Sequence, residues 1–317
     1  MSTATASVRK LRNAPLRGLL YMVAGVFWMS VMDAAAKWLT AGYPLSEIIF
    51  LGRLPMPLFA IALASMNGGL FTLRTERLGL HLLRSLASAA TMVTFFMSLR
   101  LLPLADTVAI TFISPLLMSA LSVPILGERV GPRRWTAIAV GFLGVMVILQ
   151  PSGTGFGLGP ALALMAALSY ALLNNLSRHM SSSEPSHTQL FWVSMMIIIG
   201  SGAVVPFQWV QPHGRDVLVF AVFALVATLG QFLVTQALRY AEISLLASME
   251  YSALIWATLF GFMFWNQLPT PTVLAGAAII TASSFYIVQR EARLARRNDP
   301  RRLDRISRSP QLPPDGI

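Results

Sequence analysis

Apolar residues run in long stretches along this chain, and short polar turns separate the stretches. The pattern continues without a long polar interruption from residue 18 to residue 289. A helix needs about 20 predominantly apolar residues to cross the hydrocarbon core of a bilayer, so this region has room for ten crossings. The spans that we predict are 18–38, 45–65, 80–99, 104–125, 133–150, 157–177, 188–209, 216–238, 243–264 and 271–288.

Basic residues decide between nine and ten spans. They gather before the first span, after the last span and in alternate turns, whereas the opposite turns hold only Lys37, Arg100 and Arg215. Two basic ends on one side of a membrane require an even number of spans, and the positive-inside rule places both ends in the cytoplasm. The sequence therefore predicts an all-α membrane protein with ten transmembrane helices and cytoplasmic N- and C-termini.

The two halves of the apolar region resemble each other weakly at two nearly equal offsets in residue number. The longer offset matches Lys37 with Arg178 and Pro44 with Pro185, and the shorter offset matches Phe112 with Tyr251. Each half has five spans, an odd number, so the second half would cross the membrane upside down. We therefore predict two inverted five-helix repeats, residues 18–150 and 157–289, a symmetry that lets carriers open one central site to either side.

The segments that flank the apolar region are strongly basic. We interpret residues 1–17 as a cytoplasmic N-terminus and residues 290–317 as a disordered cytoplasmic tail that faces lipid headgroups. The first apolar run is longer than the core of a signal peptide and contains Asp33, so we expect an uncleaved first span. The predicted location is the inner (plasma) membrane of a bacterium.

Composition excludes several classes of protein. Hydrophobic residues make up 55% of the chain and charged residues only 12%, too few for the polar surface of a soluble domain. The net charge of +11 comes from termini and turns, where topology places basic residues, so we expect no nucleic-acid partner. The chain has no cysteine, which removes thiolate metal sites and disulfides.

Four charged residues lie inside predicted spans, namely Asp33, Lys37, Arg53 and Glu250. A charge at the centre of a membrane helix costs about 2.5–3.5 kcal/mol, so each one needs a partner or a function. Asp33 and Lys37 lie one helical turn apart and could simply pair with each other. Arg53 could pair with Asp33 or Glu250, bind backbone carbonyls, or contact an anionic group of a substrate. The four charges sum to zero, which favours a zwitterionic or amphipathic substrate.

Glu250 is a candidate for proton coupling, because a carboxylate without a partner in a membrane span could bind and release a proton. The alternative is a carboxylate that Arg53, Arg239 or Lys37 holds permanently. Polar residues of other spans could line a shared cavity, although Ser and Thr often bond only to their own helix backbone. The substrate-binding residues that we predict are Asp33, Arg53, Thr91, Tyr170, Asn174, Gln231, Glu250 and Tyr251. Pro115, within the fourth span, should interrupt its helix and act as a hinge.

Enzyme signatures are missing from the sequence, which contains no GxSxG, HExxH or phosphate-binding loop, and we expect no enzymatic activity, cofactor or metal. Two functions remain. A carrier would move a small molecule through a central cavity, with proton coupling as one means of driving it. A membrane sensor or assembly factor would instead have internally paired charges and no cavity. Either protein would be embedded in a lipid bilayer as a monomer or homodimer.

The segment LLPLADTVAITFISPLLMSALSVPILGERVGPRRWTAIAVGFLGVMVILQP resembles the EamA-like branch of the drug/metabolite transporter superfamily. The resemblance rests on the spacing from Pro115 to Gly127 and Glu128, with Lys37 in a similar first-helix pattern. It implies ten helices in two inverted repeats, a central cavity, and transport of amino acids, vitamins or S-adenosylmethionine-like metabolites. Glu128 would be structural. Two positions depart from the family pattern: Gln267 replaces the second repeat's glutamate, and Tyr251 stands where proline is common.

Overall fold

The computed structural model describes residues 15–128, 131–150, 157–181, 183–240, 246 and 249–297, which form helices and no strands. The predicted basic N-terminal segment and tail lie largely outside these residues. Within the described part, nine helical stretches are long and apolar enough to cross a membrane, and one further apolar helix is shorter. The elements are α2 (Pro15–Leu39), α3 (Leu45–Arg53), α4 (Pro55–Met66), η1 (Leu70–Leu73), α5 (Leu78–Leu101), α6 (Leu104–Thr111), α7 (Ser114–Leu126), α8 (Pro132–Leu149), α9 (Leu158–Met180), α10 (Ser186–Gln208), α11 (Arg215–Tyr240), α13 (Ala253–Trp265) and α14 (Pro271–Arg297).

Two helices differ from the predicted spans. The short helix α13 fills only the second part of the ninth window, 243–264. Helix α14 continues to Arg297, beyond residue 289, where we expected a disordered tail to begin. The extension has the sequence REARLARR, and alanine, leucine, arginine and glutamate are all strong helix formers. Its polarity therefore ends the apolar span without ending the helix.

Three apolar stretches are broken inside the bundle. Pro55 begins α4 directly after α3, and Pro115 lies in the first turn of α7, because proline lacks the N–H that a continuing helix would need. The break at Pro115 was predicted, whereas the break at Pro55 was not. The third break lies at Tyr251 and Ser252, where no proline is present and short turns of hydrogen bonds replace the helical ones.

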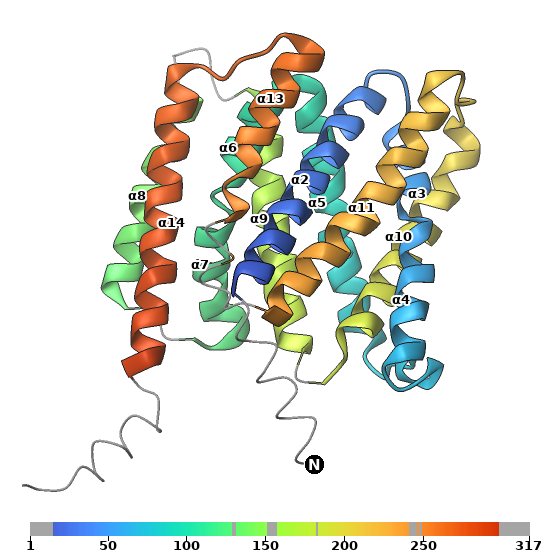
Figure 1. The fold of residues 1–317 in the computed structure, drawn as a ribbon, viewed down its shortest axis with the longest axis horizontal. Coiled ribbons are helices and arrows are strands. Elements are labelled where there is room, and N and C mark those ends of the chain that lie inside the picture. Colours follow the sequence, from blue (N-terminus) through green and yellow to red (C-terminus); the bar gives the residue numbers. More distant parts are fainter. Residues whose placement is uncertain are drawn as a thin grey trace, which may run out of the picture.

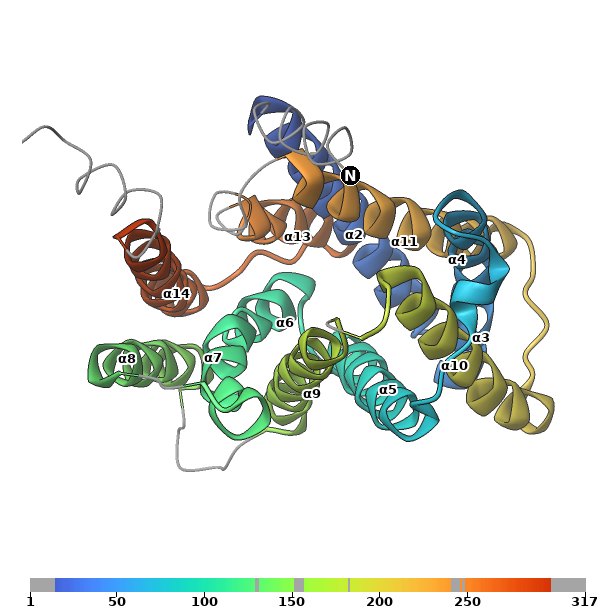
Figure 2. The same cartoon turned by 90° about the horizontal axis from the view of Figure 1, so that it is seen from below.

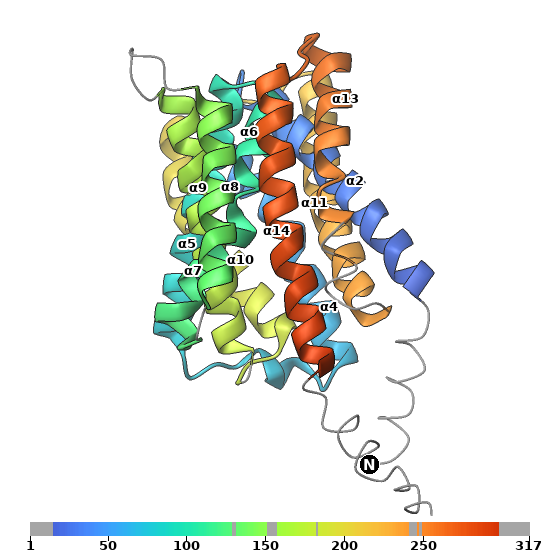
Figure 3. The same cartoon turned by 90° about the vertical axis from the view of Figure 1, so that its left-hand side faces the viewer.

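The helices form two facing rows. Figure 2 shows α13, α2 and α11 in one row and α6, α7, α9 and α5 in the row opposite. Helices α8 and α14 pack together at one end of the rows, and α3, α4 and α10 form the other end. The most extensive contacts join α2 to α11, α5 to α9 and α8 to α14. The start of α2 and the end of α14 lie at the same end of the bundle (Figures 1 and 3).

Glycines allow close approach where helices cross. A Cβ on Gly276 of α14 would lie 2.5 Å from the backbone oxygen of Gly144 in α8. A Cβ on Gly230 of α11 would lie 2.8 Å from the side chain of Met29 and 3.3 Å from the Gly25 oxygen in α2. Such contacts matter in a membrane, because lipid competes with side chains for apolar surface and tight packing has to hold helices together.

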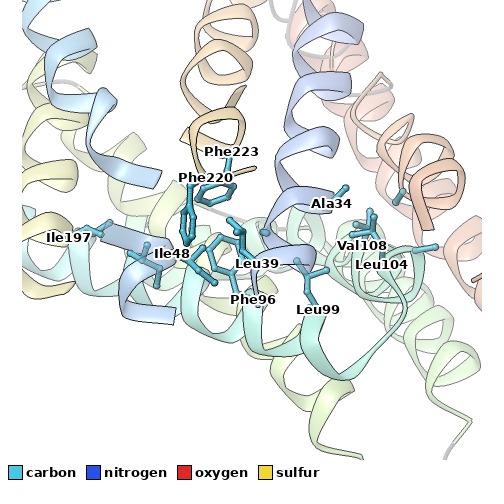
Figure 4. Close-up of a cluster of buried hydrophobic side chains, with 14 of the residues drawn as sticks. Ala34, Leu39, Ile48, Phe96, Leu99, Leu104, Val108, Ile197, Phe220 and Phe223 are labelled. Atoms are coloured by element: carbon cyan, nitrogen blue, oxygen red, sulfur yellow. The ribbon is translucent and has the colours of Figure 1, made fainter. Parts of the chain in front are cut away.

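A buried aromatic and aliphatic cluster joins α2, α3, α5 and α11 (Figure 4). Phe96 and Phe223 meet with ring centroids 6.0 Å apart, and Leu39 and Ile48 are fully buried beside them. Gly52 of α3 faces the same cluster, where an added Cβ would lie 2.1 Å from the Phe223 ring. This packing fixes one side of the bundle next to the rows that enclose the cavity described below.

Helices α7 and α13 end in the same way. Gly127 and Asn266, which the shorter repeat offset relates, both adopt a left-handed conformation, with φ of 68° and 53°. The following N–H groups, of Glu128 and Gln267, bond to the backbone oxygens of Ser122 and Gly261, which the same offset relates. Glycine and asparagine are the residues that tolerate this helix-ending conformation best.

Candidate functional site

A cavity of about 480 Å³ lies between the two rows of helices. Its walls come from α2 and α11 in one row, from α5, α6, α7 and α9 in the other, and from the broken helix around α13. Six of the eight predicted substrate-binding residues line it. These six are Asp33, Thr91, Tyr170, Asn174, Gln231 and Glu250.

The two other predicted residues, Arg53 and Tyr251, are not part of the cavity lining. The Arg53 guanidinium turns toward α5 and donates to the Met92 sulfur at 3.0 and 3.3 Å. Tyr251 packs its ring edge to face against Phe112, with centroids 5.1 Å apart, and Phe112 in turn lines the cavity. Tyr251 therefore contacts the lining through Phe112, whereas Met92, the contact of Arg53, does not line the cavity.

Lys37 does not pair with Asp33, although the two share a helix. Its Nζ donates to the Leu99 oxygen at 2.8 Å and also to the Leu102 oxygen, and it lies 5.5 Å from the centre of the Trp265 ring. The last carbonyls of a helix lack partners within that helix, and a lysine can satisfy them. Lys37 therefore caps α5, which corrects the expectation of a local ion pair.

The described cavity lining is acidic, whereas the sequence predicted a set of charges that sums to zero. Asp33 and Glu250 line the cavity, and none of the lining residues that the structure describes is basic. Among the described residues, neither carboxylate makes a hydrogen bond or ion pair, and the proposed partners Arg53 and Lys37 are bound elsewhere. The side chain of Arg239, another proposed partner of Glu250, lies outside the described part. The four intramembrane charges thus do not form one neutral group.

Polar groups of the lining mostly bond to their own helices. Thr91 donates to the Ala87 oxygen at 2.8 Å, and Thr111 donates to the Val108 oxygen at the same distance. The Asn174 amide donates to the Tyr170 oxygen at 2.8 Å, which turns its own carbonyl oxygen away from that bond. Such bonds satisfy the donors and leave hydroxyl and carbonyl oxygens as acceptors for a bound molecule.

The remaining lining residues were not among the eight predicted substrate-binding residues. Most are apolar, and an apolar side chain of a membrane helix can face lipid, protein or a cavity equally well, so no sequence signal distinguishes them. They are Met22, Val26, Met29, Ser30, Phe95, Val108, Thr111, Phe112, Ser114, Ala166, Ala167, Val234 and Ala253.

Pairs of lining residues recur at the two offsets that relate the halves of the sequence. The longer offset relates Asp33 to Asn174 and Met29 to Tyr170. Equivalent positions of the two halves therefore face the same cavity, but the carboxylates correspond to neutral side chains. The shorter offset relates three further pairs, which are Phe95 and Val234, Thr111 and Glu250, and Ser114 and Ala253.

The two ends of the bundle are closed by different polar contacts. At the end where α2 begins, Glu128 pairs with Arg178 at 2.7 Å, and buried His81 contacts Glu184 at 2.6 Å. At the opposite end, Tyr43 donates to Asp216 at 2.8 Å. Desolvation and the Asp216 carboxylate raise the pKa of Tyr43, which stays neutral and able to donate.

The Gln267 end lacks the ion pair of the Glu128 end. Gln267 and Lys37 are the offset equivalents of Glu128 and Arg178, and Asp106 is the acidic group that interacts electrostatically with Lys37. The Gln267 Oε1 atom is buried and has no hydrogen-bond partner among the described residues. The departure of Gln267 from the glutamate of the first half therefore changes the charge of this end.

Comparison with known proteins gives consistent matches along the chain. The sequence model of the EamA-like transporter family matches residues 16–150 and again residues 157–289. A riboflavin transporter of Rhizobium johnstonii is 27% identical over 88% of this chain and 93% of its own length. An S-adenosylmethionine uptake transporter of Rickettsia prowazekii is 23% identical, covering 87% of this chain and 94% of the relative.

Two further matches extend this picture. The pseudopaline exporter CntI of Pseudomonas aeruginosa is 24% identical over 85% of this chain and 95% of its own length. A crystal structure of a protein aligns with a TM-score of 0.60 at 19% identity and covers 89% of this chain and 98% of the other. The structural match shows a shared fold.

Proposed function

The chain belongs to the EamA-like transporter family, and from that premise we propose that it is a secondary carrier that moves a small metabolite by alternating access around its central cavity. It is a multi-pass membrane protein and a small-molecule transporter, and its named relatives are transporters, not enzymes. The observation that carries the proposal is the cavity between the two rows, lined by two carboxylates and by polar and aromatic side chains.

The proposed architecture is ten transmembrane helices in two inverted five-helix repeats. Three observations support it: the family model matches twice, the helix ends at Gly127 and Asn266 share one geometry, and lining residues correspond at fixed offsets. The helix pairs support it too. The repeat relates α2 to α9, α5 to α11 and α8 to α14. The α2–α11 contact therefore corresponds to the α9–α5 contact, and the α8–α14 contact corresponds to itself.

Inverted repeats give a physical route to alternating access. If the halves exchange their conformations, the cavity opens to the opposite side without a second binding site. We place both termini in the cytoplasm of a bacterial inner membrane, because basic turns lie at the end where α2 begins. Glu250 is the residue that we assign to proton coupling, since it is a carboxylate of the cavity lining that makes no ion pair with another described residue.

The sensor or assembly-factor alternative predicts paired charges and no cavity. Asp33 and Glu250 in the lining speak against it. The relatives include uptake transporters and an exporter, and the molecules in their names, riboflavin, S-adenosylmethionine and pseudopaline, differ widely. The direction of transport and the identity of the substrate therefore do not follow from membership of the family. An experiment that tests transport should depend on neither of them.

Transport is tested with purified protein in proteoliposomes, offered a pool of metabolites that includes riboflavin and S-adenosylmethionine, with and without a pH gradient. Asn174→Trp should fill the cavity and abolish flux. Leu168→Trp adds the same side chain to the same helix at an exposed position that does not line the cavity, and it should transport normally. Wild-type protein that is folded but moves nothing in the pool would contradict the proposal.

A further inference from the structure

The two walls of the cavity differ in chemistry. Asp33 belongs to α2 and Glu250 precedes α13, and these two helices lie in the row that also contains α11. The opposite row contributes Phe95 of α5, Phe112 directly after α6 and Tyr170 of α9. An acidic wall therefore faces an aromatic wall. Glu250 lies close enough to the Tyr170 hydroxyl to interact with it electrostatically across the space between them.

Nothing in the described lining compensates the two carboxylates. Lys37 is held by the carbonyls at the end of α5, and Arg53 is held by Met92. A membrane protein keeps an ionisable group in a span when that group has a partner or a function, because the charge is costly there. The group that enters this cavity can supply the missing positive charge.

The aromatic wall suits the same kind of molecule. Aromatic faces attract cations through their ring quadrupole, and they also stack on apolar rings. Met22 and Met29 add polarisable, adaptable surface to the cavity. A volume of about 480 Å³ is in the range of pockets that enclose small organic molecules.

We propose that the cavity selects an amphipathic organic cation, whose charged group binds between Asp33 and Glu250 while its apolar part packs against Phe95, Phe112 and Tyr170. This proposal rests on the transport function proposed above and adds the substrate class to it. The sequence favoured a zwitterionic or amphipathic substrate; the proposal keeps the amphipathic character and replaces the balanced charge with a net positive one, because Lys37 and Arg53 do not line the cavity.

The correspondence between the halves supplies a matched set of variants. Asp33→Asn gives the α2 position the side chain that Asn174 has at the equivalent position of α9. Asn174→Asp does the reverse and adds a carboxylate to the opposite wall. Glu250→Gln removes the second charge at nearly constant size. Glu76→Gln makes the same change at an exposed turn and serves as the control.

The experiment offers wild-type proteoliposomes a defined pool with equal numbers of organic cations, zwitterions, neutral compounds and anions, and identifies by mass spectrometry what accumulates. We expect cations to dominate. Asp33→Asn with Glu250→Gln should lower cation uptake at least roughly tenfold, as expected for the loss of charge-assisted contacts. Asn174→Asp should lower the KM for the same cation, and Glu76→Gln should change nothing.

Uptake confined to neutral compounds or anions would overturn the proposed substrate class and leave the transport function intact. Cation uptake that is unchanged in the folded double variant would overturn the roles of Asp33 and Glu250. Absence of any flux from folded wild-type protein would instead contradict the transport function, and the substrate class with it. If the double variant fails to fold, the charge of the compounds that wild-type protein accumulates still decides the class.

Discussion

Phe112 and Tyr251 meet edge to face where two helices are broken, with ring centroids 5.1 Å apart and ring planes at 86°. The shorter repeat offset relates these two residues, and the same offset relates Gly127 to Asn266. Each ring thus lies at the equivalent break of its own half, and the halves touch each other there. Because Phe112 also lines the cavity, a change at this contact can reach the bound molecule directly.

The aromatic contact should couple the two breaks. Tyr251→Ala removes an edge-to-face pair that contributes about 0.5–1.5 kcal/mol beyond area burial, so we expect lower thermal stability in detergent and slower transport. Tyr251→Phe keeps the ring and should behave like wild-type protein in both assays. Normal stability and normal transport in Tyr251→Ala would show that the contact between Tyr251 and Phe112 does not link the two helix breaks.

The crossing of α8 and α14 should tolerate no side chain. Gly276→Val would place a branched side chain where even a Cβ lies 2.5 Å from the Gly144 oxygen and 2.4 Å from the Ile148 side chain, so the helices must separate. We expect poor yield of folded protein by size-exclusion chromatography. Gly79→Ala, in the first turn of α5 with no atom within 4 Å of the new Cβ, is the matched control and should fold normally. A well-folded Gly276→Val protein would contradict this account of the crossing.

The left-handed end of α13 offers a gain in stability. Asparagine at a φ of 53° is strained relative to glycine, so Asn266→Gly should raise the melting temperature slightly or leave it unchanged. Asn266→Ala should lower the melting temperature, because alanine fits this conformation worse than asparagine or glycine. We expect the free energy of unfolding to fall by about 1 kcal/mol. Equal melting temperatures for Asn266→Gly and Asn266→Ala would contradict the role given to this backbone conformation.

The missing glutamate at position 267 should affect the rate of transport. Gln267→Glu would place a carboxylate at the position equivalent to Glu128. We expect it to pair with Lys37, as Glu128 pairs with Arg178, and so to strengthen closure of this end of the bundle. Lys37 and the Gln267 Oε1 atom are both buried, so the added carboxylate would depend on Lys37 as its partner, and we expect turnover to fall by a few fold. Gln267→Met, which adds no charge, should transport at the wild-type rate. Equal turnover of the glutamate and methionine variants would argue against closure at this end.

Much of the fold follows from sequence, because the length and polarity of a membrane helix are set by the bilayer. Most span boundaries and the break at Pro115 could be predicted on that basis. Six cavity residues could also be predicted, since polar groups in a membrane tend to face protein or a cavity. The break at Tyr251 and Ser252 could not, because it has no proline to mark it.

The direction of a side chain is the part that sequence leaves open. Arg53 is the last residue of α3, and the next helix, α4, begins at Pro55. Its side chain contacts Met92 beside this break in the helix, which hydropathy does not report. Lys37 caps a neighbouring helix, which depends on packing between segments far apart in sequence. Apolar lining residues such as Phe95 and Met29 are indistinguishable from lipid-facing ones until the helices are placed.

Alternating access of one cavity is the central claim, and the natural absence of cysteine allows a direct test of it. Thr111, a partly exposed residue of the cavity lining, is replaced by cysteine and reacted with a membrane-impermeant maleimide in right-side-out and inside-out vesicles. Alternating access should give labelling from both sides, and addition of the transported compound should slow both reactions. Labelling from one side alone, under every substrate and pH condition, would contradict it.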